Sequence, residues 1–409
     1  MVKKTKRQLR YEGIKKPKRN KVERWVAVAD QPGHHKKLEN MAVVRLLLYE
    51  ACCGILSGVS ALDEVMRELK DEFGPKFVIV GILGHDIGCE RKRKQDYFSS
   101  CLFTAIEVIH RWWIRPPGGR PGVLWRVESL DILSEEGQDE AFRSFREMRE
   151  QLKRERREPT HVVCLGGPPC QDNSRAKARP NKKKGRDGIK TIINIFRRIE
   201  NDMGANNVTS IVENTSEMNP EQKKKIKKMF MEEGYQVLEV KPQDAGIPMR
   251  RNRLYALRAP RLSQVTQETY KTFIAQKERE MEDPRYYLPE GGYQLLVGDK
   301  NSRRPIQEHE IDEFVYHAFN CKGQATDDVQ KDGITVPIPL ETEWALMTGR
   351  PLDCPLLQEM REIIDKGEME EDSMRFKFLE TDLRTMIGNS MCVSNVVDVI
   401  SFSFNNFFS

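Results

Sequence analysis

The stretch HVVCLGGPPCQ, residues 161–171, decides how the rest of the chain is interpreted. Its first five residues form an apolar run of the length of a buried strand, and two glycines and two prolines then fix a special turn. Open α/β sheets keep their chemistry at the carboxyl ends of parallel strands. Cys170 lies at such an end, so the stretch predicts an α/β fold with a thiol at its functional edge.

Around this stretch, apolar runs of strand length alternate with segments of helical periodicity from about residue 43 to residue 260. Strands are expected at seven places, 43–49, 77–83, 124–127, 162–165, 208–212, 235–240 and 254–257. Helices are expected at 58–73, through 106–109, along 142–152, and at 187–203 and 220–233. This alternation predicts a mostly parallel seven-stranded sheet that helices cover on both faces.

The pattern changes after Pro260. Residues 261–335 are polar and hold several glycines and prolines, which predicts a second, smaller lobe. Helical, apolar-periodic sequence returns from Leu340. We therefore expect a main domain over 43–260, an inserted lobe over 261–335 and a segment, 336–409, that returns to the main domain.

Charge is concentrated at the N-terminus. The chain carries a net charge of +6, but residues 1–24 alone hold eleven Lys or Arg against two acids. Residues 1–42 are interpreted as a basic, disordered tail, which is either simply solvated or also a phosphate-binding arm or nuclear-import signal. The expected location is the nucleus if the chain is eukaryotic, and the cytoplasm otherwise.

The cysteines and the apolar residues exclude several classes of protein. The nine cysteines are odd in number and show neither a C-x-x-C pair nor zinc-like spacing. Free thiols in a reducing compartment and no metal site are therefore expected. No run of 18 apolar residues and no apolar core near the N-terminus occurs, so we expect neither a membrane span nor a secretory signal.

Cys170 is the candidate nucleophile. An ordinary thiol has a pKa near 8.5 and is only a few per cent thiolate at neutral pH. Backbone N–H groups at a strand-to-loop turn favour the thiolate. The alternative, a structural buried cysteine, suits Cys164 inside the strand better than Cys170 on the turn.

Two further segments offer partners for this thiol. The run IVENT, residues 211–215, delivers Glu213 at another strand end, where burial would raise its pKa and let it donate a proton. The run GIPMRRNRLYAL, residues 246–257, puts Arg251 and Arg253 on one face of an extended segment. Two guanidiniums there suit an anionic or carbonyl-bearing ligand, although a Glu in a loop or charges on a solvated edge strand are the alternatives.

A cofactor pocket is suggested by weaker signals at the other strand ends. The turn GILSG, residues 54–58, allows close backbone approach. Asp86 follows the second strand, where such folds place an acid on a ribose, with His85 as the competing assignment. Asp131 and Ile132 follow the third strand and could hold an adenine. The run GNS, residues 388–390, opens a C-terminal helix that could equally be plain packing.

Taken in order, these segments resemble the cytosine carbon-5 DNA methyltransferases. The motifs that carry the resemblance are GILSG, DI, GGPPCQ, VENT, GIPMRRNRLY and GNSMCV, and they span residues 43–260 and 340–400. The sequence looks most like the de novo enzymes. It departs from the family at Cys52 and Cys53, where an aromatic and a small or acidic residue are common, so the cofactor pocket is less certain than the catalytic core.

The resemblance implies a Rossmann-like, class I fold that binds S-adenosylmethionine and needs no metal. Cys170 would add to carbon 6 of cytosine, Glu213 would bind ring nitrogen 3 and the exocyclic amine, and Arg253 and Arg251 would contact the base carbonyl. The implied cofactor residues are Gly54, Ile55, Gly58, Asp86, Asp131, Ile132, Pro168, Asn389 and Ser390.

The implied partner is double-stranded DNA, from which the target cytosine must flip out. Residues 174–190 hold eight Lys or Arg and one acid, and could close on the DNA backbone unless they are only a solvated loop. Their expected DNA contacts are Ser174, which would help to fill the vacated stack, Arg175, Lys177, Arg179, Lys182, Lys183, Lys184 and Arg186. The inserted lobe would be a target recognition domain, with Arg303 and Arg304, beside Lys300 and Asn301, reading bases or phosphates.

Two alternatives stay open. A relative of this family methylates cytosine in tRNA and has a similar PPCQ motif, but its C-F-T signature is absent from residues 261–335. A catalytically inactive regulatory paralogue would have lost the nucleophile or the acid, whereas both Cys170 and Glu213 are present.

Overall fold

The computed structural model describes residues 43–52, 57–73, 77–86, 123–132, 134–168, 182–260, 266–298, 302–317, 328–349, 352, 355–366, 383–384, 387 and 390–408. In this part of the chain, the main domain is built on a seven-stranded sheet in the order β3-β2-β1-β4-β5-β8-β6. The strands are β1 (Val44–Ala51), β2 (Phe77–Asp86), β3 (Leu124–Ser129), β4 (His161–Gly166), β5 (Val208–Thr215), β6 (Gln236–Val240) and β8 (Arg253–Arg258). All pairs are parallel except those of β8, which runs antiparallel to β5 and β6.

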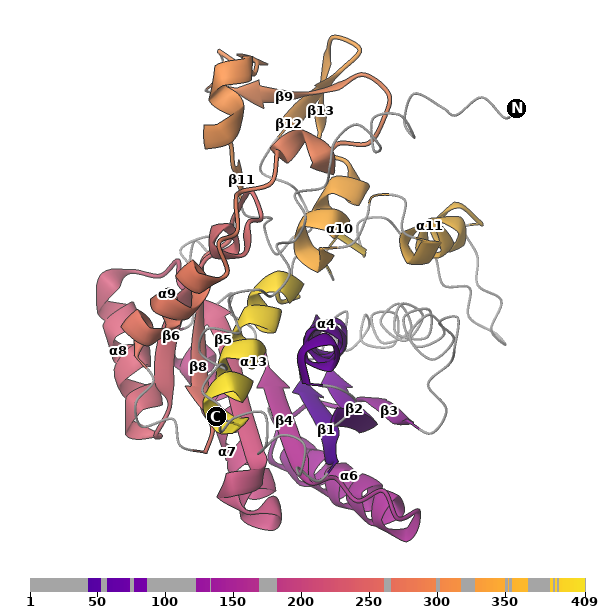
Figure 1. Cartoon of the computed structure of the whole chain (residues 1–409), viewed down its shortest axis with the longest axis vertical. Helices are drawn as coiled ribbons and strands as arrows, with labels where there is room; N and C mark the ends of the chain where they lie inside the picture. Colours follow the sequence, from indigo (N-terminus) through magenta and orange to yellow (C-terminus); the bar gives the residue numbers. More distant parts are fainter. Residues whose placement is uncertain are drawn as a thin grey trace.

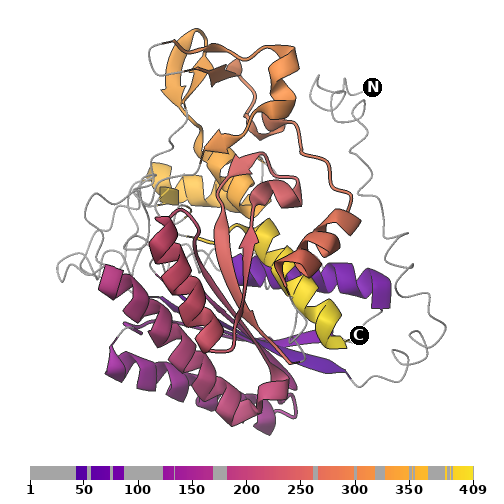
Figure 2. The same cartoon turned by 90° about the vertical axis from the view of Figure 1, so that its left-hand side faces the viewer.

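Helices cover both faces of this sheet (Figures 1 and 2). One layer consists of α6 (Glu135–Arg154), α7 (Lys182–Met203) and α8 (Pro220–Glu232), and the other of α4 (Ser57–Phe73), α9 (Gln267–Gln276) and α13 (Val393–Phe408). Alternation along β1 sorts its side chains into two cores, with Leu46 and Leu48 toward α4 and α13 and Leu47 and Tyr49 toward α6 and α7. The α/β fold and its mostly parallel seven-stranded sheet are therefore confirmed.

Local sequence explains where these helices begin and which face they bury. In α6, the Ser134 side chain caps the first turn by accepting from the Gly137 N–H, and Phe145, Met148 and Leu152 are buried at helical spacing. Asn219 caps α8 in the same way, with Pro220 at its first position. None of the helices that the structure describes is long and apolar enough to cross a membrane.

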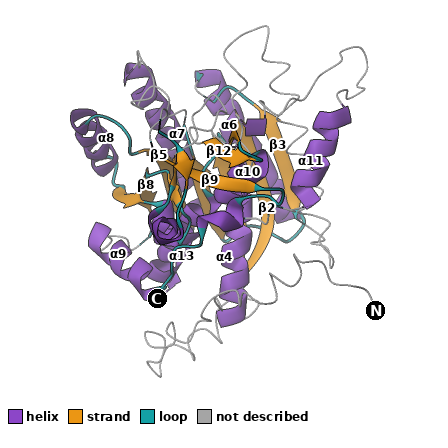
Figure 3. Ribbon diagram, turned by 90° about the horizontal axis from the view of Figure 1, so that it is seen from above, coloured by secondary structure: helices purple, strands orange, loops and turns teal. Residues whose placement is uncertain are grey.

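A second, antiparallel sheet lies above the main domain in Figure 1 and over α10 (Leu340–Thr348) in Figure 3. Its order is β10-β9-β12-β13, formed by β9 (Tyr293–Val297), β10 (Arg304–Pro305), β12 (Asp328–Lys331) and β13 (Ile334–Pro337). The remaining described helices are α11 (Pro355–Lys366) and the short helices η1 (Ala205–Asn207), η2 (Pro242–Ala245), η4 (Pro284–Tyr287) and η5 (Glu308–Glu313).

One parallel strand pair joins the two lobes. Strand β7 (Met249–Arg250) leads into β8 of the main sheet, and β11 (Tyr316–His317) belongs to the chain of the small lobe. Tyr316 is fully buried, its N–H donates to the carbonyl of Pro248 at 2.8 Å and its hydroxyl donates to the carbonyl of Pro284 at 2.7 Å. The junction between the lobes is therefore held by backbone pairing around a buried tyrosine.

Candidate active site

A buried ion pair occupies the carboxyl end of β5. Antiparallel pairing of β5 with β8 places Thr215 opposite Arg253, and the Arg253 Nε lies 2.6 Å from the Glu213 Oε1. Glu213 is 6% exposed and Arg253 is 7% exposed, so water screens their interaction little. The second expected arginine, Arg251, is 2% exposed, and its charge also acts on Glu213.

Burial and charge oppose each other at Glu213. Desolvation raises the pKa of Glu213 above its ordinary value, while Arg253 and Arg251 act in the opposite direction. The net shift is upward, so the carboxyl holds a proton more readily than an exposed glutamate does. A carboxyl in this state can donate a hydrogen bond to a ring nitrogen.

Arg251 connects this ion pair to the C-terminal segment. Its Nη2 donates to the carbonyl of Ser390 at 2.9 Å, and the Ser390 hydroxyl donates to the carbonyl of Ile387 at 2.6 Å. The structure thus brings Ser390 next to the arginines, a contact between residues 139 positions apart in the sequence. The motif GNS suggests a cofactor role for this serine, which stays a prediction; in the structure its carbonyl binds Arg251 and its hydroxyl binds Ile387.

The turn after β4 faces the same carboxylate. A Cβ added at Gly166 would lie 2.7 Å from the Ile192 side chain, so α7 packs too closely for a larger residue. A Cβ at Gly167 would lie 3.5 Å from the Glu213 Oε2. Cys170 itself is outside the described residues, but it follows Gly167 by three positions, and chain connectivity limits the distance between their Cα atoms to about 11 Å.

Glu50 is a site residue that the sequence reasoning missed. It is fully buried at the end of β1, and its Oε1 accepts from the Gly58 N–H at 3.1 Å, at the start of α4. Burial raises the pKa of Glu50 to about 8, although the hydrogen bonds from Gly58 and Val59 lower it. The signal available in the sequence was an acid that ends an otherwise apolar strand, four residues before the GILSG turn.

His85 and Asp86, the two candidates for a ribose contact, lie in different surroundings. His85 is fully buried, with its Nδ1 3.3 Å from the Tyr49 hydroxyl and its Nε2 2.9 Å from the Glu128 carboxylate. Asp86 is half-buried, and its negative charge helps to raise the pKa of both Glu50 and Cys52. Asp86 therefore lies with the strand ends that frame the expected cofactor pocket, and His85 belongs to the interior.

The motif DI after β3 suggests an adenine contact for Asp131 and Ile132, and the structure shows that the two residues differ in burial. Ile132 is fully buried in the core under α6 and α7. Asp131 is exposed. Burial raises the pKa of the Cys52 thiol, and the charges of Asp86 and Asp131 act in the same direction. Cys52 itself has a left-handed backbone with φ of 55°. The carboxylates at the ends of β1, β2 and β3 offer acceptors for the hydroxyls and the ammonium group of a nucleoside–amino acid cofactor.

Several predicted site residues cannot be compared with the structure. Gly54, Ile55, Cys170, Ser174, Arg175, Lys177, Arg179 and Asn389 lie outside the described residues, as do Lys300, Asn301 and the basic tail 1–42. The backbone of Lys182, Lys183 and Lys184 forms the first turn of α7, and Arg186 is half-buried in the next turn. Pro168 is buried at the turn after β4. Their functional roles stay predictions.

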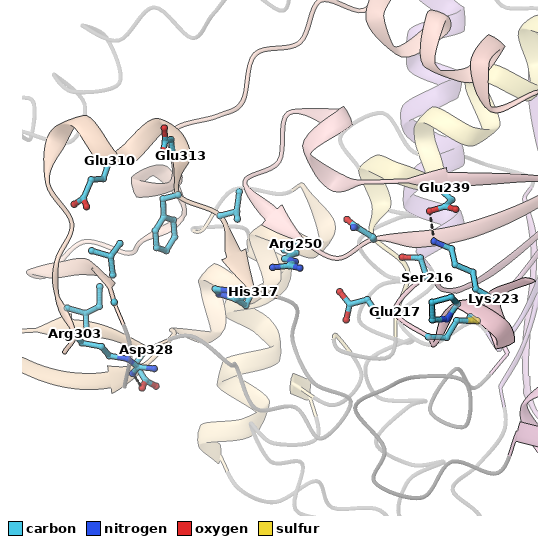
Figure 4. A pocket seen from close by; sticks show the side chains of 18 residues that line it. Ser216, Glu217, Lys223, Glu239, Arg250, Arg303, Glu310, Glu313, His317 and Asp328 are labelled. Atoms are coloured by element: carbon cyan, nitrogen blue, oxygen red, sulfur yellow. Dashed lines mark hydrogen bonds and ion pairs between the residues drawn. The ribbon is translucent and has the colours of Figure 1, made fainter. Parts of the chain in front are cut away.

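The two arginines of the small lobe that the sequence predicts to contact DNA, Arg303 and Arg304, are held by acids. Arg303 forms an ion pair with Asp328, and Arg304 binds the Glu310 carboxylate through two nitrogens at 2.8 and 2.6 Å. Arg303 and Glu310 line a cleft of about 1170 Å³ between the lobes, which is shown in Figure 4. No group of three or more His, Cys, Asp or Glu side chains in the described part of the chain is placed to hold a metal ion.

Comparison with known proteins identifies the central part of this chain. Residues 139–335 match the family model described as C-5 cytosine-specific DNA methylase. The chain matches no curated protein sequence. Among solved structures it is similar to the Dnmt2 methyltransferase of S. pombe, with 17% identity, 88% of this chain and 98% of that chain covered and a TM-score of 0.47. It is also similar to the methyltransferase EhMeth of Entamoeba histolytica, with 13% identity, the same coverage and a TM-score of 0.44.

Proposed function

We propose that this chain, whose residues 139–335 match the family model described as C-5 cytosine-specific DNA methylase, methylates carbon 5 of cytosine in double-stranded DNA. The observation that carries the proposal is the buried Glu213–Arg253 ion pair, with Arg251 beside it, facing the turn that leads to Cys170. A buried acid with two guanidiniums can bind the three polar groups of cytosine, namely ring nitrogen 3, the exocyclic amine and the carbonyl.

Each residue has a defined task in this reaction. Carbon 5 of cytosine is a poor nucleophile until the Cys170 thiolate adds to carbon 6. Glu213, whose pKa is raised by burial, donates a proton or hydrogen bond to ring nitrogen 3 as charge develops on the ring, and accepts from the exocyclic amine. Arg253 and Arg251 contact the base carbonyl. Once carbon 5 has taken the methyl group, transfer of its proton to water and cleavage of the bond between carbon 6 and the Cys170 sulfur would restore the ring and free the thiolate.

The methyl donor is S-adenosylmethionine, as the match to this family model implies, and it supplies an electrophilic methyl group when bound. Glu50, Asp86 and Asp131 would hold its polar groups at the ends of β1, β2 and β3, together with Gly58 at the start of α4. The close contact between Gly58 and Glu50 supports this assignment, because a Cβ at Gly58 would lie 2.8 Å from the Glu50 Oε2. A larger residue would displace the carboxylate from the pocket.

DNA is proposed as the substrate because the matched family model is that of a DNA methylase and because the segment 174–190, directly after Cys170, is strongly basic. Phosphate contacts from that segment would offset the few kcal/mol that flipping a base costs. The expected nuclear location, through the basic tail, belongs to the same proposal.

The proposal is tested by transfer of labelled methyl from S-adenosylmethionine to three substrates side by side: unmethylated duplex DNA, hemimethylated duplex DNA and tRNA. We expect transfer to DNA that Cys170→Ala abolishes. Transfer to tRNA alone would contradict DNA as the substrate, while retaining the chemistry. Cofactor binding without transfer to any of the three would support a regulatory role.

A further inference from the structure

Arg250 points away from the catalytic pair. Side chains alternate along the extended segment 250–253, and Arg251 and Arg253 are buried beside Glu213. Arg250, one position earlier, is exposed and lines the cleft between the lobes. Consecutive Cα atoms are about 3.8 Å apart. The backbone of Arg250 therefore directly adjoins that of Arg251, while its side chain lies in the cleft.

The small lobe places a second side chain at the same point. Pairing of β7 with β11 sets His317 opposite Arg250, and Figure 4 shows both side chains at the middle of the cleft. The backbone on each side is anchored, because Met249 and Tyr316 are both fully buried. The position of Arg250 is thus fixed by the lobe junction rather than by a mobile loop.

The charges of the cleft single out Arg250. Lys223 binds Glu239 at 2.6 Å, and Arg303 binds Asp328, so each of these cations of the lining already has an acid beside it. Within the described residues, no carboxylate lies within ion-pair distance of the Arg250 guanidinium. Of the cations that line the cleft, Arg250 is therefore the one whose charge is least offset by a neighbouring carboxylate.

We propose that Arg250 binds a backbone phosphate of the strand that carries the target cytosine, next to the flipped nucleotide, with His317 beside the same contact. This inference rests on the proposed function. A guanidinium offers parallel N–H donors that match two phosphate oxygens, and such contacts set the register of a nucleic acid without reading its sequence. Arg250 is then a positioning residue, which sets how the strand enters the Glu213 site.

The test compares the full-length wild-type chain with Arg250→Ala and Arg250→Lys, using one unmethylated duplex over a range of salt concentrations. Arg143→Ala is the matched control, because Arg143 is exposed on α6, outside the cleft. For Arg250→Ala we expect about a tenfold or greater rise in KM for the duplex and little change in kcat. The slope of log Kd against log salt should fall by about 0.9, the value for one lost phosphate contact. Arg250→Lys should restore part of the affinity, and the Tm of each variant should stay at the wild-type value.

The outcomes separate this inference from the proposed function. An active wild-type enzyme whose Arg250→Ala variant keeps the duplex KM and the salt slope would overturn the inference and leave the function standing. A fall in kcat at unchanged KM would also overturn it, since that would place Arg250 in the chemical step. A wild-type chain that neither binds nor methylates the duplex would overturn both.

Discussion

Two ion pairs formed by arginine, one in each lobe, differ in their exposure to water. In the main domain, Arg251 and Arg253 are buried beside a single carboxylate, Glu213, whose pKa is raised. In the small lobe, Arg304 is 49% exposed and pairs with Glu310, whose pKa is held at about 2 mainly by the hydrogen bond from that arginine. Both are ion pairs by distance, and in both the arginine lowers the pKa of its carboxyl partner, but the opposing effect of burial is the larger one at Glu213 and not at Glu310.

The difference shows what each pair can do. A buried pair lacks water to replace a lost partner, so its members stay together and shape a site. An exposed pair contributes about 0–1 kcal/mol and can exchange partners with little cost. Under the proposed function, the Glu213 cluster would recognise one base, while Arg304 could exchange Glu310 for a phosphate of the nucleic acid.

The largest expected effect is on catalysis at Glu213. Glu213→Gln keeps the shape of the side chain but removes the acid, so it should lower kcat for methyl transfer by about 10²–10³, the range for the loss of one charge-stabilising group in an active site. Glu232→Gln, on the exposed surface of α8, is the control. A kcat near the wild-type value in Glu213→Gln would show that the buried pair has no catalytic role, and would contradict the difference drawn between the two lobes.

The next effect is on stability. Arg253→Ala removes one of the two guanidiniums that stabilise the buried Glu213 carboxylate. It should lower the free energy of unfolding, measured in urea, by about 3–5 kcal/mol. Arg304→Ala should leave the free energy of unfolding close to the wild-type value, because solvent screens this exposed pair. Equal losses in the two variants would show that burial does not distinguish the pairs.

The buried carboxyl of Glu50 gives a pH-dependent test. Because its pKa in the folded protein is raised from 4.5 to about 8, its protonated form stabilises the fold at low pH, and this contribution is lost as pH rises from about 4.5 through 8. Glu50→Gln should therefore gain stability relative to the wild type, by a few kcal/mol between pH 5 and 9. A difference between the two proteins that does not change with pH would contradict the buried, proton-binding state of Glu50.

The smallest expected effect concerns duplex binding by the small lobe. Glu310→Gln removes the partner of Arg304 and one negative charge from the cleft, so duplex affinity should rise about threefold to tenfold at low salt. Glu308→Gln is a matched control, since Glu308 pairs with Arg285 outside the cleft lining. An equal rise in both variants would indicate a general charge effect rather than release of Arg304.

The sequence was sufficient for the parts of the molecule that depend on local pattern. The alternation of apolar runs predicted the seven strands. The end of β4 was placed within one residue, whereas β5 continues to Thr215, three residues beyond the expected strand over 208–212. Alternation along β8 and its preceding loop also explained why Arg251 and Arg253 are together.

Contacts between distant segments could not be predicted in the same way. The bond from Arg251 to Ser390 and the pairing of Arg250 with His317 depend on how the lobes and the C-terminal helix dock, which no local periodicity encodes. Ile132 illustrates the same limit, because a motif position did not reveal that its side chain packs into the core. The ion pairs of Arg303 and Arg304 likewise required the fold of the small lobe.

The most direct test of the central claim is a trapping experiment with a duplex that carries 5-fluorocytosine, incubated with S-adenosylmethionine. Fluorine at carbon 5 cannot leave as a proton does, so the bond between Cys170 and carbon 6 should persist. We expect a covalent protein–DNA complex that survives denaturation, with the modified peptide containing Cys170 and no complex from Cys170→Ala. A complex formed through another cysteine, or by Cys170→Ala at the wild-type yield, would contradict the assignment of Cys170 as the nucleophile.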